Sequence, residues 1–235
     1  MDRVASIIRR VRRGPRRIVL ELRKRLRMRA AKRLGIRFVP PNIVYRNVIQ
    51  TGDVVVDAGC ADDPEFSKHM IAEHGAIAWG IDPTRKHAEA LTCLTSELSG
   101  FRYMPVAIAT RAGHMTFHES LDNVSGSLLD DHVNVVRDRG RAYEVEAVDL
   151  KTLASRIGAE AIAVLKLDLE GAEYELLGAA KAADLQPFDQ IFVEFHHHAV
   201  SRYSLRDTWE VVRRLEMIGL KAFSLDDHNF IFYRV

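Results

Sequence analysis

The sequence predicts an α/β fold with a mainly parallel, doubly wound sheet and an antiparallel C-terminal hairpin. After residue 38, short apolar runs alternate with helix-like stretches, a pattern typical of βαβ units. The last two apolar runs, residues 220–227 and 229–235, are joined by the short polar turn Asp227-His228, which predicts a hairpin at one sheet edge. At 235 residues, the chain is long enough to bury the core of one such domain.

The strands are predicted from apolar runs that end in turn residues. The first, DVVVDAGC, is a buried run that ends in an acid and a glycine, as expected of a parallel strand in such a sheet. The five main strands are predicted at residues 53–60, 76–83, 101–109, 161–169 and 190–195. Residues 113–120 and 143–150 are predicted as additional strands, and residues 120–140 as a loop with some helix.

The helices are predicted from their start and stop signals. Residues 40–50 begin with proline and stop before Gly52, which favours a short helix. Ser204 opens the stretch SLRD, a capping-box pattern for a helix that runs to Gly219. The remaining helices are predicted at residues 66–75, 86–98, 151–158 and 171–185.

The composition indicates a globular chain from a reducing compartment. Apolar residues make up 47% and charged residues 28% of the sequence. The two cysteines, Cys60 and Cys93, form no CxxC pattern and no metal-finger spacing, which predicts a cytoplasmic location. No apolar run approaches the roughly 20 residues of a membrane span, so we expect neither a transmembrane helix nor a secretory signal.

The charges are segregated along the chain. Residues 1–37 hold 15 Lys or Arg against Asp2 and Glu21, a net charge of +13, whereas the remaining 198 residues hold 19 basic and 30 acidic side chains, a net charge of −11. Apolar residues recur at helical spacing in the basic segment, at Val4, Ile7, Ile8, Val11, Ile18, Leu22 and Leu26. The sequence therefore predicts a basic amphipathic helical extension, residues 1–37, before the main domain, residues 38–235.

Three interpretations of this extension are open. A basic amphipathic helix suits an anionic membrane, which would make the protein peripheral at the inner membrane surface. The extension could instead fold onto the acidic body or onto a second subunit of a homo-oligomer. Nucleic-acid binding through phosphate contacts is the least favoured, because the apolar stripe is better explained by a membrane than by phosphates.

Polar residues gather where the predicted strands end, which is where ligands bind in a doubly wound sheet. These residues are Asp57, Gly59, Asp82, Asp168, Glu170, Glu194 and His196. Gly59 permits close approach of a ligand, and Asp82 ends the second strand, where a carboxylate can accept hydrogen bonds from ribose hydroxyls. The loop lacks GxGxxG and carries Asp62, Asp63 and Glu65, so it favours a cationic cofactor such as S-adenosylmethionine over a pyrophosphate.

The stretch KLDLEGAEYELLGA, residues 166–179, places charge in a buried strand. Side chains alternate between the faces of a strand, so Lys166 and Asp168 share one face, and Glu194 and His196 share a face of the next strand. A buried lysine needs a partner, and we expect Lys166 to pair with Glu194 beneath a site formed by Asp168 and His196. A purely structural ion pair is the alternative.

This stretch resembles the signature K-[IV]-D-[VI]-E-G-[AS]-E … L-x-G-A of FkbM-type methyltransferases. VVVDAGC, GIDP, VEAVDLKTLA and IFVEFH follow the family's order around it, so that the resemblance covers residues 38–235. It implies a class I, Rossmann-like fold that uses S-adenosylmethionine, usually to methylate a hydroxyl of a sugar, glycan or polyketide-type product. The chain departs from the family's Gly-Ala-Asn-x-Gly loop, because the second glycine is missing from Gly59-Cys60-Ala61-Asp62-Asp63-Pro64.

The resemblance and the strand ends together assign roles to the site residues. Asp168 is the first candidate for the base or a metal ligand and His196 the second, because a base within hydrogen-bond reach activates an alcohol. Lys166, Glu194 and Glu170 complete the predicted catalytic set, with Glu170 and Glu173 in substrate-binding or helix-start roles. The predicted cofactor-binding residues are Asp57, Gly59, Cys60, Asp82, Pro83 and Ala107. Cys60 is interpreted as a small loop residue rather than a nucleophile, because no motif places a base beside it.

A metal is not favoured. The three histidines at 196–198 alternate faces in a strand, so they cannot converge on one ion, although a carboxylate-rich site can bind Mg²⁺. The function expected from the sequence is O-methyl transfer to a saccharide, glycan or lipid-linked glycan. A non-catalytic binding or scaffold protein of the same fold and an RNA methyltransferase that uses the basic arm are the alternatives. The strand end Leu-Asp-Leu-Glu disfavours the latter, because base amines are served by an Asn-Pro-Pro-Tyr type of motif.

Overall fold

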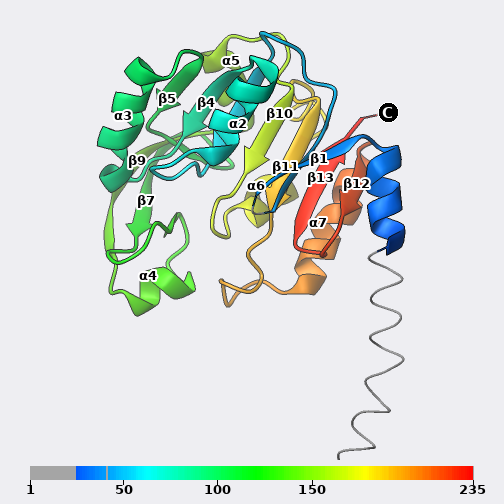
Figure 1. Ribbon diagram of the computed structural model, residues 1–235. Helices are drawn as coiled ribbons and strands as arrows, with labels where there is room; N and C mark the ends of the chain where they lie inside the picture. Colours follow the sequence, from blue (N-terminus) through cyan, green and yellow to red (C-terminus); the bar gives the residue numbers. More distant parts are fainter. Residues whose placement is uncertain (1–24, 41, 235) are drawn as a thin grey trace, which may run out of the picture.

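The fold is built on one seven-stranded sheet, seen in a computed structural model that describes residues 25–40 and 42–234 (Figure 1). Its strands are β3 (Val54–Ala58), β4 (Ile77–Ile81), β5 (Phe101–Met104), β10 (Val164–Leu167), β11 (Gln190–Glu194), β12 (Lys221–Ser224) and β13 (Asn229–Tyr233). They lie in the order β12-β13-β11-β10-β3-β4-β5, and β13 runs antiparallel to both of its neighbours. The predicted mainly parallel sheet and its C-terminal hairpin are confirmed.

Helices cover both faces of this sheet, as the predicted double winding requires. They are α2 (Glu65–His74), the 3-10 helix η1 (Arg85–His87), α3 (Ala88–Glu97), α5 (Leu150–Ile157), α6 (Glu173–Ala179) and α7 (Leu205–Met217). One core cluster packs α5, α6 and α7 against the sheet through side chains such as Leu153, Leu177 and Leu215. The other packs α2 and α3 on the opposite face through Phe66 and Leu91.

The capping-box pattern at Ser204 is confirmed at the start of α7. The backbone N–H and the hydroxyl of Ser204 both donate to Asp207 Oδ2, at 2.7 and 2.6 Å. These bonds satisfy a backbone donor that the first turn of a helix would otherwise leave unpaired.

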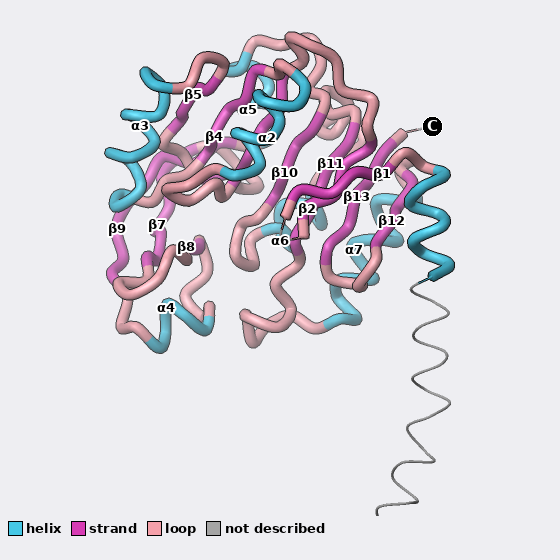
Figure 2. The backbone as a smooth tube through the Cα atoms, in the orientation of Figure 1, coloured by secondary structure: helices cyan, strands magenta, loops and turns pink. Residues whose placement is uncertain are grey.

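A second, smaller sheet stands beside the main one (Figure 2). Its order is β6-β9-β7-β8, with β6 (Ala107–Ile108), β7 (Gly113–Glu119), β8 (Gly126–Ser127) and β9 (Arg141–Val148), and the short helix α4 (Val133–Arg137) follows β8. The predicted strand at 101–109 is therefore two strands in two sheets. Pro105 lies between them and has no backbone N–H to donate, so the chain leaves the main sheet there.

The predicted helix at 40–50 is wrong. Residues Ile43–Arg46 form β2, which pairs antiparallel with β1 (Ile36–Val39). Ile43, Val44 and Tyr45 are all buried in the α2-side core, and a short apolar run of this kind has no period that separates a strand from a helix. Tertiary burial rather than local propensity decides its structure.

Part of the predicted basic extension is described. Residues 25–33 are helical, and Ala31 is buried in the same core cluster as β1 and β2. β1 spans the predicted domain boundary between residues 37 and 38. The helices expected over residues 1–24 lie outside the described residues. Among the described residues, no helix is both long enough and apolar enough to cross a membrane.

Candidate active site

A cavity opens at the carboxyl ends of β3, β4 and β10, where the strand order reverses. It encloses about 640 Å³ of empty space, counting the solvent in its open mouth. Six of the residues predicted to be functional line it: Gly59, Asp82, Pro83, Ala107, Asp168 and Glu170. The small sheet adds an apolar wall that includes Phe117 and Leu128. The two sheets thus enclose one pocket between a polar floor and an apolar side.

Gly59 is the point of closest approach between two strand ends. Its φ is +71°, in the left-handed region, and a Cβ added there would lie 1.8 Å from the backbone oxygen of Asp168. No side chain larger than hydrogen fits this position without moving the backbone. The glycine therefore lets the loop after β3 lie against the end of β10, where the cavity opens.

Asp82 is held ready to accept hydrogen bonds inside the cavity. Its Oδ2 accepts the N–H of Ala61 at 2.9 Å, and its Oδ1 accepts the N–H of Thr84 at 2.8 Å. Burial by itself raises the pKa of this carboxyl, but hydrogen bonds from His87 and Thr84 outweigh it and leave the pKa lowered. Asp82 is therefore ionised, and its remaining lone pairs suit the hydroxyls of a ribose.

Lys166 links the two strand ends beneath the cavity. Its Nζ lies 3.0 Å from Asp57 Oδ1 and 3.3 Å from Asp168 Oδ2, and it donates to the backbone oxygen of Gly59 at 3.1 Å. The predicted partner Glu194 is wrong, because that carboxylate pairs with His228 at 3.2 Å. β10 and β11 are neighbours as expected, but their register sets Phe192 beside Lys166, while Asp57 on β3 lies directly opposite.

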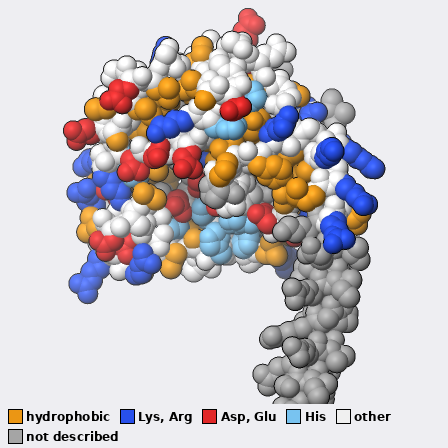
Figure 3. All heavy atoms as spheres, viewed as in Figure 1, with side chains coloured by type: hydrophobic (Ala, Val, Ile, Leu, Met, Phe, Trp, Pro, Cys, Tyr) orange, Lys and Arg blue, Asp and Glu red, His pale blue; other side chains and the backbone are white. Residues whose placement is uncertain are grey.

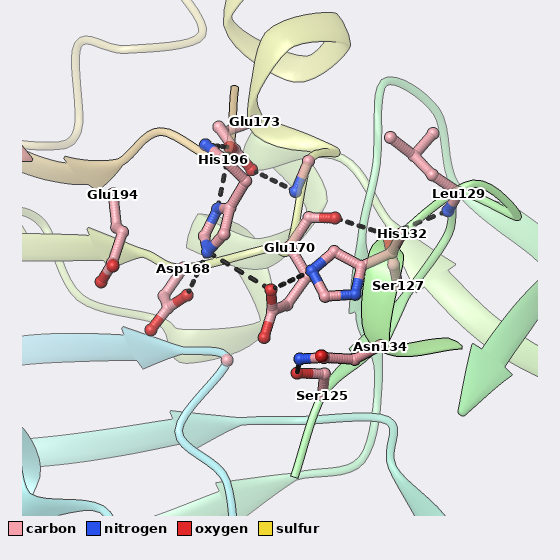
Figure 4. A network of polar contacts seen from close by, with 12 residues as sticks. Ser125, Ser127, Leu129, His132, Asn134, Asp168, Glu170, Glu173, Glu194 and His196 are labelled. Atoms are coloured by element: carbon pink, nitrogen blue, oxygen red, sulfur yellow. Dashed lines mark hydrogen bonds and ion pairs between the residues drawn. The ribbon is translucent and has the colours of Figure 1, made fainter. Parts of the chain in front are cut away.

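His196 is the centre of a network of carboxylates (Figure 4). Its Nδ1 lies 3.0 Å from Glu173 Oε1, and its Nε2 lies 3.5 Å from Asp168 Oδ1 and 3.3 Å from Glu170 Oε2. The buried Glu173 also accepts the backbone N–H groups of His196 and Gly171. On the other side, Glu170 Oε2 lies 2.8 Å from Nε2 of the buried His132.

This network shifts the pKa values of its members in different directions. Burial lowers the pKa of His196, but Glu173, Asp168 and Glu170 outweigh burial and raise the pKa to about 10. Burial raises the pKa of Asp168 to about 6 although Lys166 and His196 oppose the change. For Glu170, burial is outweighed by His132 and His196, so its pKa lies well below the usual range. These pKa values make the imidazole of His196 a cation and Asp168 an ionised carboxylate at neutral pH, which favours Asp168 over His196 as the base.

Glu170 has a strained backbone at the mouth of the cavity. Its φ is +51°, a conformation uncommon for a residue with a side chain, and Gly171 follows at +107°. The carbonyl of Glu170 accepts the hydroxyl of Ser127, and its carboxylate is fixed by His132 and His196. Strain that the surroundings hold in place in this way is typical of functional sites.

Five predicted site residues lie outside the cavity wall: Lys166 and His196, whose contacts are given above, and Asp57, Cys60 and Glu194. Asp57 is buried and anchors α2, because its Oδ2 accepts the N–H and the hydroxyl of Ser67. Cys60 is buried in the α2-side core, where burial raises the pKa of its thiol and disfavours the thiolate that a nucleophile needs. Glu194 stands apart from the network in Figure 4 and pairs with His228.

The sequence leaves residues 125–132 open between an acceptor rim and an ordinary surface loop, and it singles out neither His132 nor His228. His132 ends the stretch SGSLLDDH, which has no clean period, and it reaches Glu170 because a bridge to Val200 holds it against the loop after β11. His228 lies in the hairpin turn, where polar residues are common for local reasons. Only the three-dimensional arrangement identifies either one. The described residues contain no group of three His, Cys, Asp or Glu side chains arranged to hold a metal ion.

The residues that line the cavity fit S-adenosylmethionine. An ionised Asp82 suits the ribose, the apolar wall with Phe117 suits the adenine, and the carboxylates of Asp168 and Glu170 suit the positive sulfonium and ammonium groups. When the strands of the main sheet are numbered along the chain, their order in the sheet is 3-2-1-4-5-7-6. Only strand 7, which is β13, runs antiparallel to the others. This topology and this cavity define a class I S-adenosylmethionine-dependent methyltransferase.

Comparison with known protein families agrees with this assignment to the methyltransferases. The sequence matches the family described as "Methyltransferase FkbM domain" over residues 31–216, which is most of the chain. The chain therefore belongs to the FkbM methyltransferase family, and the resemblance stated from its motifs is confirmed. No curated protein matches the sequence significantly.

Solved structures with a similar arrangement are distant in sequence. A fibrillarin pre-rRNA processing protein of Methanococcus jannaschii is 14% identical, with a TM-score of 0.48 over 87% of this chain and 73% of that chain. A SAM-dependent methyltransferase from Aquifex aeolicus is 11% identical, with a TM-score of 0.39 over 79% of this chain and 82% of that chain. TrmK of M. capricolum, solved with S-adenosylhomocysteine, is 12% identical, with a TM-score of 0.36 over 79% and 62%.

Proposed function

We propose that this methyltransferase transfers its methyl group to a hydroxyl of a saccharide, glycan or lipid-linked glycan. The observation that supports it best is the position of Asp168. This carboxylate borders the same cavity as Asp82, and burial raises its pKa to about 6. A base of this kind is ionised at neutral pH yet basic enough to take a proton from an alcohol as the new bond forms.

The chain's own residues supply binding, orientation and proton transfer. S-adenosylmethionine, when bound, supplies the electrophilic methyl group. Asp82 holds a ribose, while Asp168 accepts the proton of the acceptor hydroxyl. Lys166 and His196 fix the Asp168 carboxylate from two sides. Orientation of this kind can be equivalent to an effective concentration on the order of 10⁵ M or more, and the base adds roughly 10²-fold or more in rate.

One observation favours the non-catalytic alternative. The loop after β3 lacks the family's second glycine, since Asp63 stands at that position. The loop nevertheless keeps a left-handed residue, because Ala61 has a φ of +52° and donates its N–H to Asp82. The cavity is therefore formed without the second glycine, and turnover separates an enzyme from a binding protein.

The experiment combines calorimetry with a turnover assay. The protein is titrated with S-adenosylmethionine, then incubated with it and with glycan, glycolipid or RNA fractions. We expect release of S-adenosylhomocysteine only with hydroxyl-bearing saccharide acceptors, which gain the mass of one CH₂ group. Binding without turnover on any acceptor would favour the scaffold alternative, and methylated RNA would favour the nucleic-acid alternative.

A matched pair of variants tests the role of Asp168. Asp168→Asn removes the base and keeps the size of the side chain, so we expect a loss of about 10²-fold or more in kcat, with cofactor affinity retained within about tenfold. Glu175→Gln, at an exposed position of α6, removes one carboxylate outside the site and should leave kcat unchanged. Equal rates in the two variants would show that Asp168 is not the base.

The pH profile gives a second test of the same residue. Asp168 acts only when ionised, so kcat should rise as the pH increases through about 6 and then level off. A rate that stays constant from pH 5 to pH 8 would contradict this role.

A further inference from the structure

The helix formed by residues 25–33 packs its apolar side against the core of the protein. Ala31 is buried in the core cluster on the α2 side, and Ala30 and Leu34 pack against that cluster. At about 100° per residue, Arg25, Arg29 and Lys32 then lie within an arc of about 60° on the opposite side. The helix therefore faces outward with its cations.

This outward side, which we call the basic face, consists of Arg25, Arg29, Lys32 and Arg33, all of them exposed. Figure 3 shows Lys and Arg side chains gathered at the edge of the molecule that carries the helix. Among the described residues, no carboxylate forms an ion pair with any of the four. The acidic body thus holds the helix in place without neutralising the charges that the helix displays.

The helix is attached to the turn between β12 and β13. Arg27 donates to the backbone oxygen of Leu225 at 2.8 Å and pairs with Asp227 at 2.5 Å. The same turn carries His228, which contacts Glu194 at the end of β11. Since β11, β10 and β3 all end at the same edge of the sheet, this turn and the helix attached to it lie toward the edge where the cavity opens, with β11 and β13 between the helix and the cavity.

We propose that the basic face docks the protein on a membrane surface of anionic phospholipids. Basic side chains near such a surface are attracted to its headgroups, and unpaired charges on one side of a helix present them together. Leu26 and Met28 flank the basic face and are 62% and 43% exposed. Burial of these apolar side chains at the boundary between the headgroups and the acyl chains would add to the binding free energy.

Two other partners fit these observations less well. A nucleic acid would be bound through its phosphates, and the exposed apolar side chains of Leu26 and Met28 make no favourable contact with phosphates. A second copy packed through the same helix would bring like charges together, because a two-fold interface places the same patch on both subunits. Docking through this helix would also bring the protein close to acceptors that are held in a membrane.

The experiment measures binding of the full chain to vesicles by sedimentation. Phosphatidylglycerol-containing vesicles are compared with pure phosphatidylcholine vesicles, at low and at high salt. The test variant is Arg25→Gln/Arg29→Gln/Lys32→Gln. Its control, Arg111→Gln/Lys151→Gln/Arg213→Gln, removes the same charge from three exposed residues elsewhere on the body. No turnover is needed, so the outcome is independent of the proposed reaction.

We expect binding only to the anionic vesicles, and release at high salt. Each removed charge should cost roughly fivefold in affinity, so the test variant should lose on the order of 100-fold and the control variant only a few fold. Equal losses in both variants, or binding of the test variant at wild-type strength, would overturn the proposal. The proposal would also be overturned if an RNA oligonucleotide bound more tightly than the vesicles through the same three residues. A test variant that lost a dimer but bound vesicles as the wild type does would overturn it as well.

Discussion

Single residues at the strand ends determine what this site can do, because several have no tolerated substitute. Gly59 is the clearest case, since the space for a Cβ is taken by the backbone of Asp168. Glu173 is another, because its two oxygens accept from backbone N–H groups on both sides of the site. A change at either position alters the geometry of the cavity and not merely one contact.

Gly59→Ala should be strongly destabilising. The new methyl group would meet the Asp168 carbonyl at 1.8 Å, so we expect a loss of more than about 3 kcal/mol in the free energy of unfolding, together with loss of cofactor binding. Gly158→Ala is the matched control, because Gly158 also has a φ of +71° but no atom near the position of the Cβ. It should cost only about 1–2 kcal/mol. Thermal unfolding of both variants measures the difference.

His196 should make stability depend on pH. Its pKa in the folded protein is about 10, above the value of about 6.5 in an unfolded chain, so the folded state binds the proton more tightly. The stabilisation is fully present below about pH 6.5 and is lost as the pH rises through about 10, by on the order of 2–4 kcal/mol. Urea unfolding at several pH values should show this decline, and His196→Gln should remove it. His114→Gln, at an exposed position, should retain it.

At the scale of elements, the sequence predicts those whose signals are local. The capping box of α7, the glycine stop after α2 and the C-terminal hairpin need only neighbouring residues, and all are present. β2 was predicted as a helix because its apolar run is too short to show a period. The partner of Lys166 was also predicted wrongly, because the order and register of the strands, which place Asp57 opposite it, are not encoded locally.

Asp207 tests how much the start of α7 contributes. Asp207→Ala removes the acceptor for both donors of Ser204, so we expect a loss of about 1 kcal/mol in stability. Glu210→Ala removes a nearby exposed carboxylate that pairs with Arg206, and should cost about 0.3–0.5 kcal/mol. Chemical unfolding of the two variants compares them, and equal losses would mean that the cap is not needed.

At the scale of the whole molecule, the candidate site was predicted in part. Carboxylates at the carboxyl ends of parallel strands lie at the same edge of the sheet whatever the exact register of the strands. Asp82, Asp168 and Glu170 could therefore be predicted from the sequence. His132 was not, because it comes from the segment after β8 and reaches the site only through the packing of that segment on the loop after β11.

The attachment of the N-terminal helix can be measured directly. Arg27→Ala removes the contacts to Leu225 and Asp227, so we expect the helix at residues 25–33 to open more readily, by about 1 kcal/mol. Hydrogen exchange of its backbone amides reports this opening. Arg33→Ala, which removes an exposed arginine of the same helix, should leave the exchange rates nearly unchanged. Faster exchange in both variants would mean that Arg27 is not the anchor.

The break at Pro105 gives the molecule two independent walls. The polar floor of the pocket is formed by the ends of main-sheet strands, whereas Phe117 and Leu128 belong to the small sheet and its loops. The apolar side can therefore change while the core strands keep their register. An engineer who wants to reshape that side has the segment between β7 and β9 to vary, as long as Ser127 and His132, which hold Glu170, stay in place.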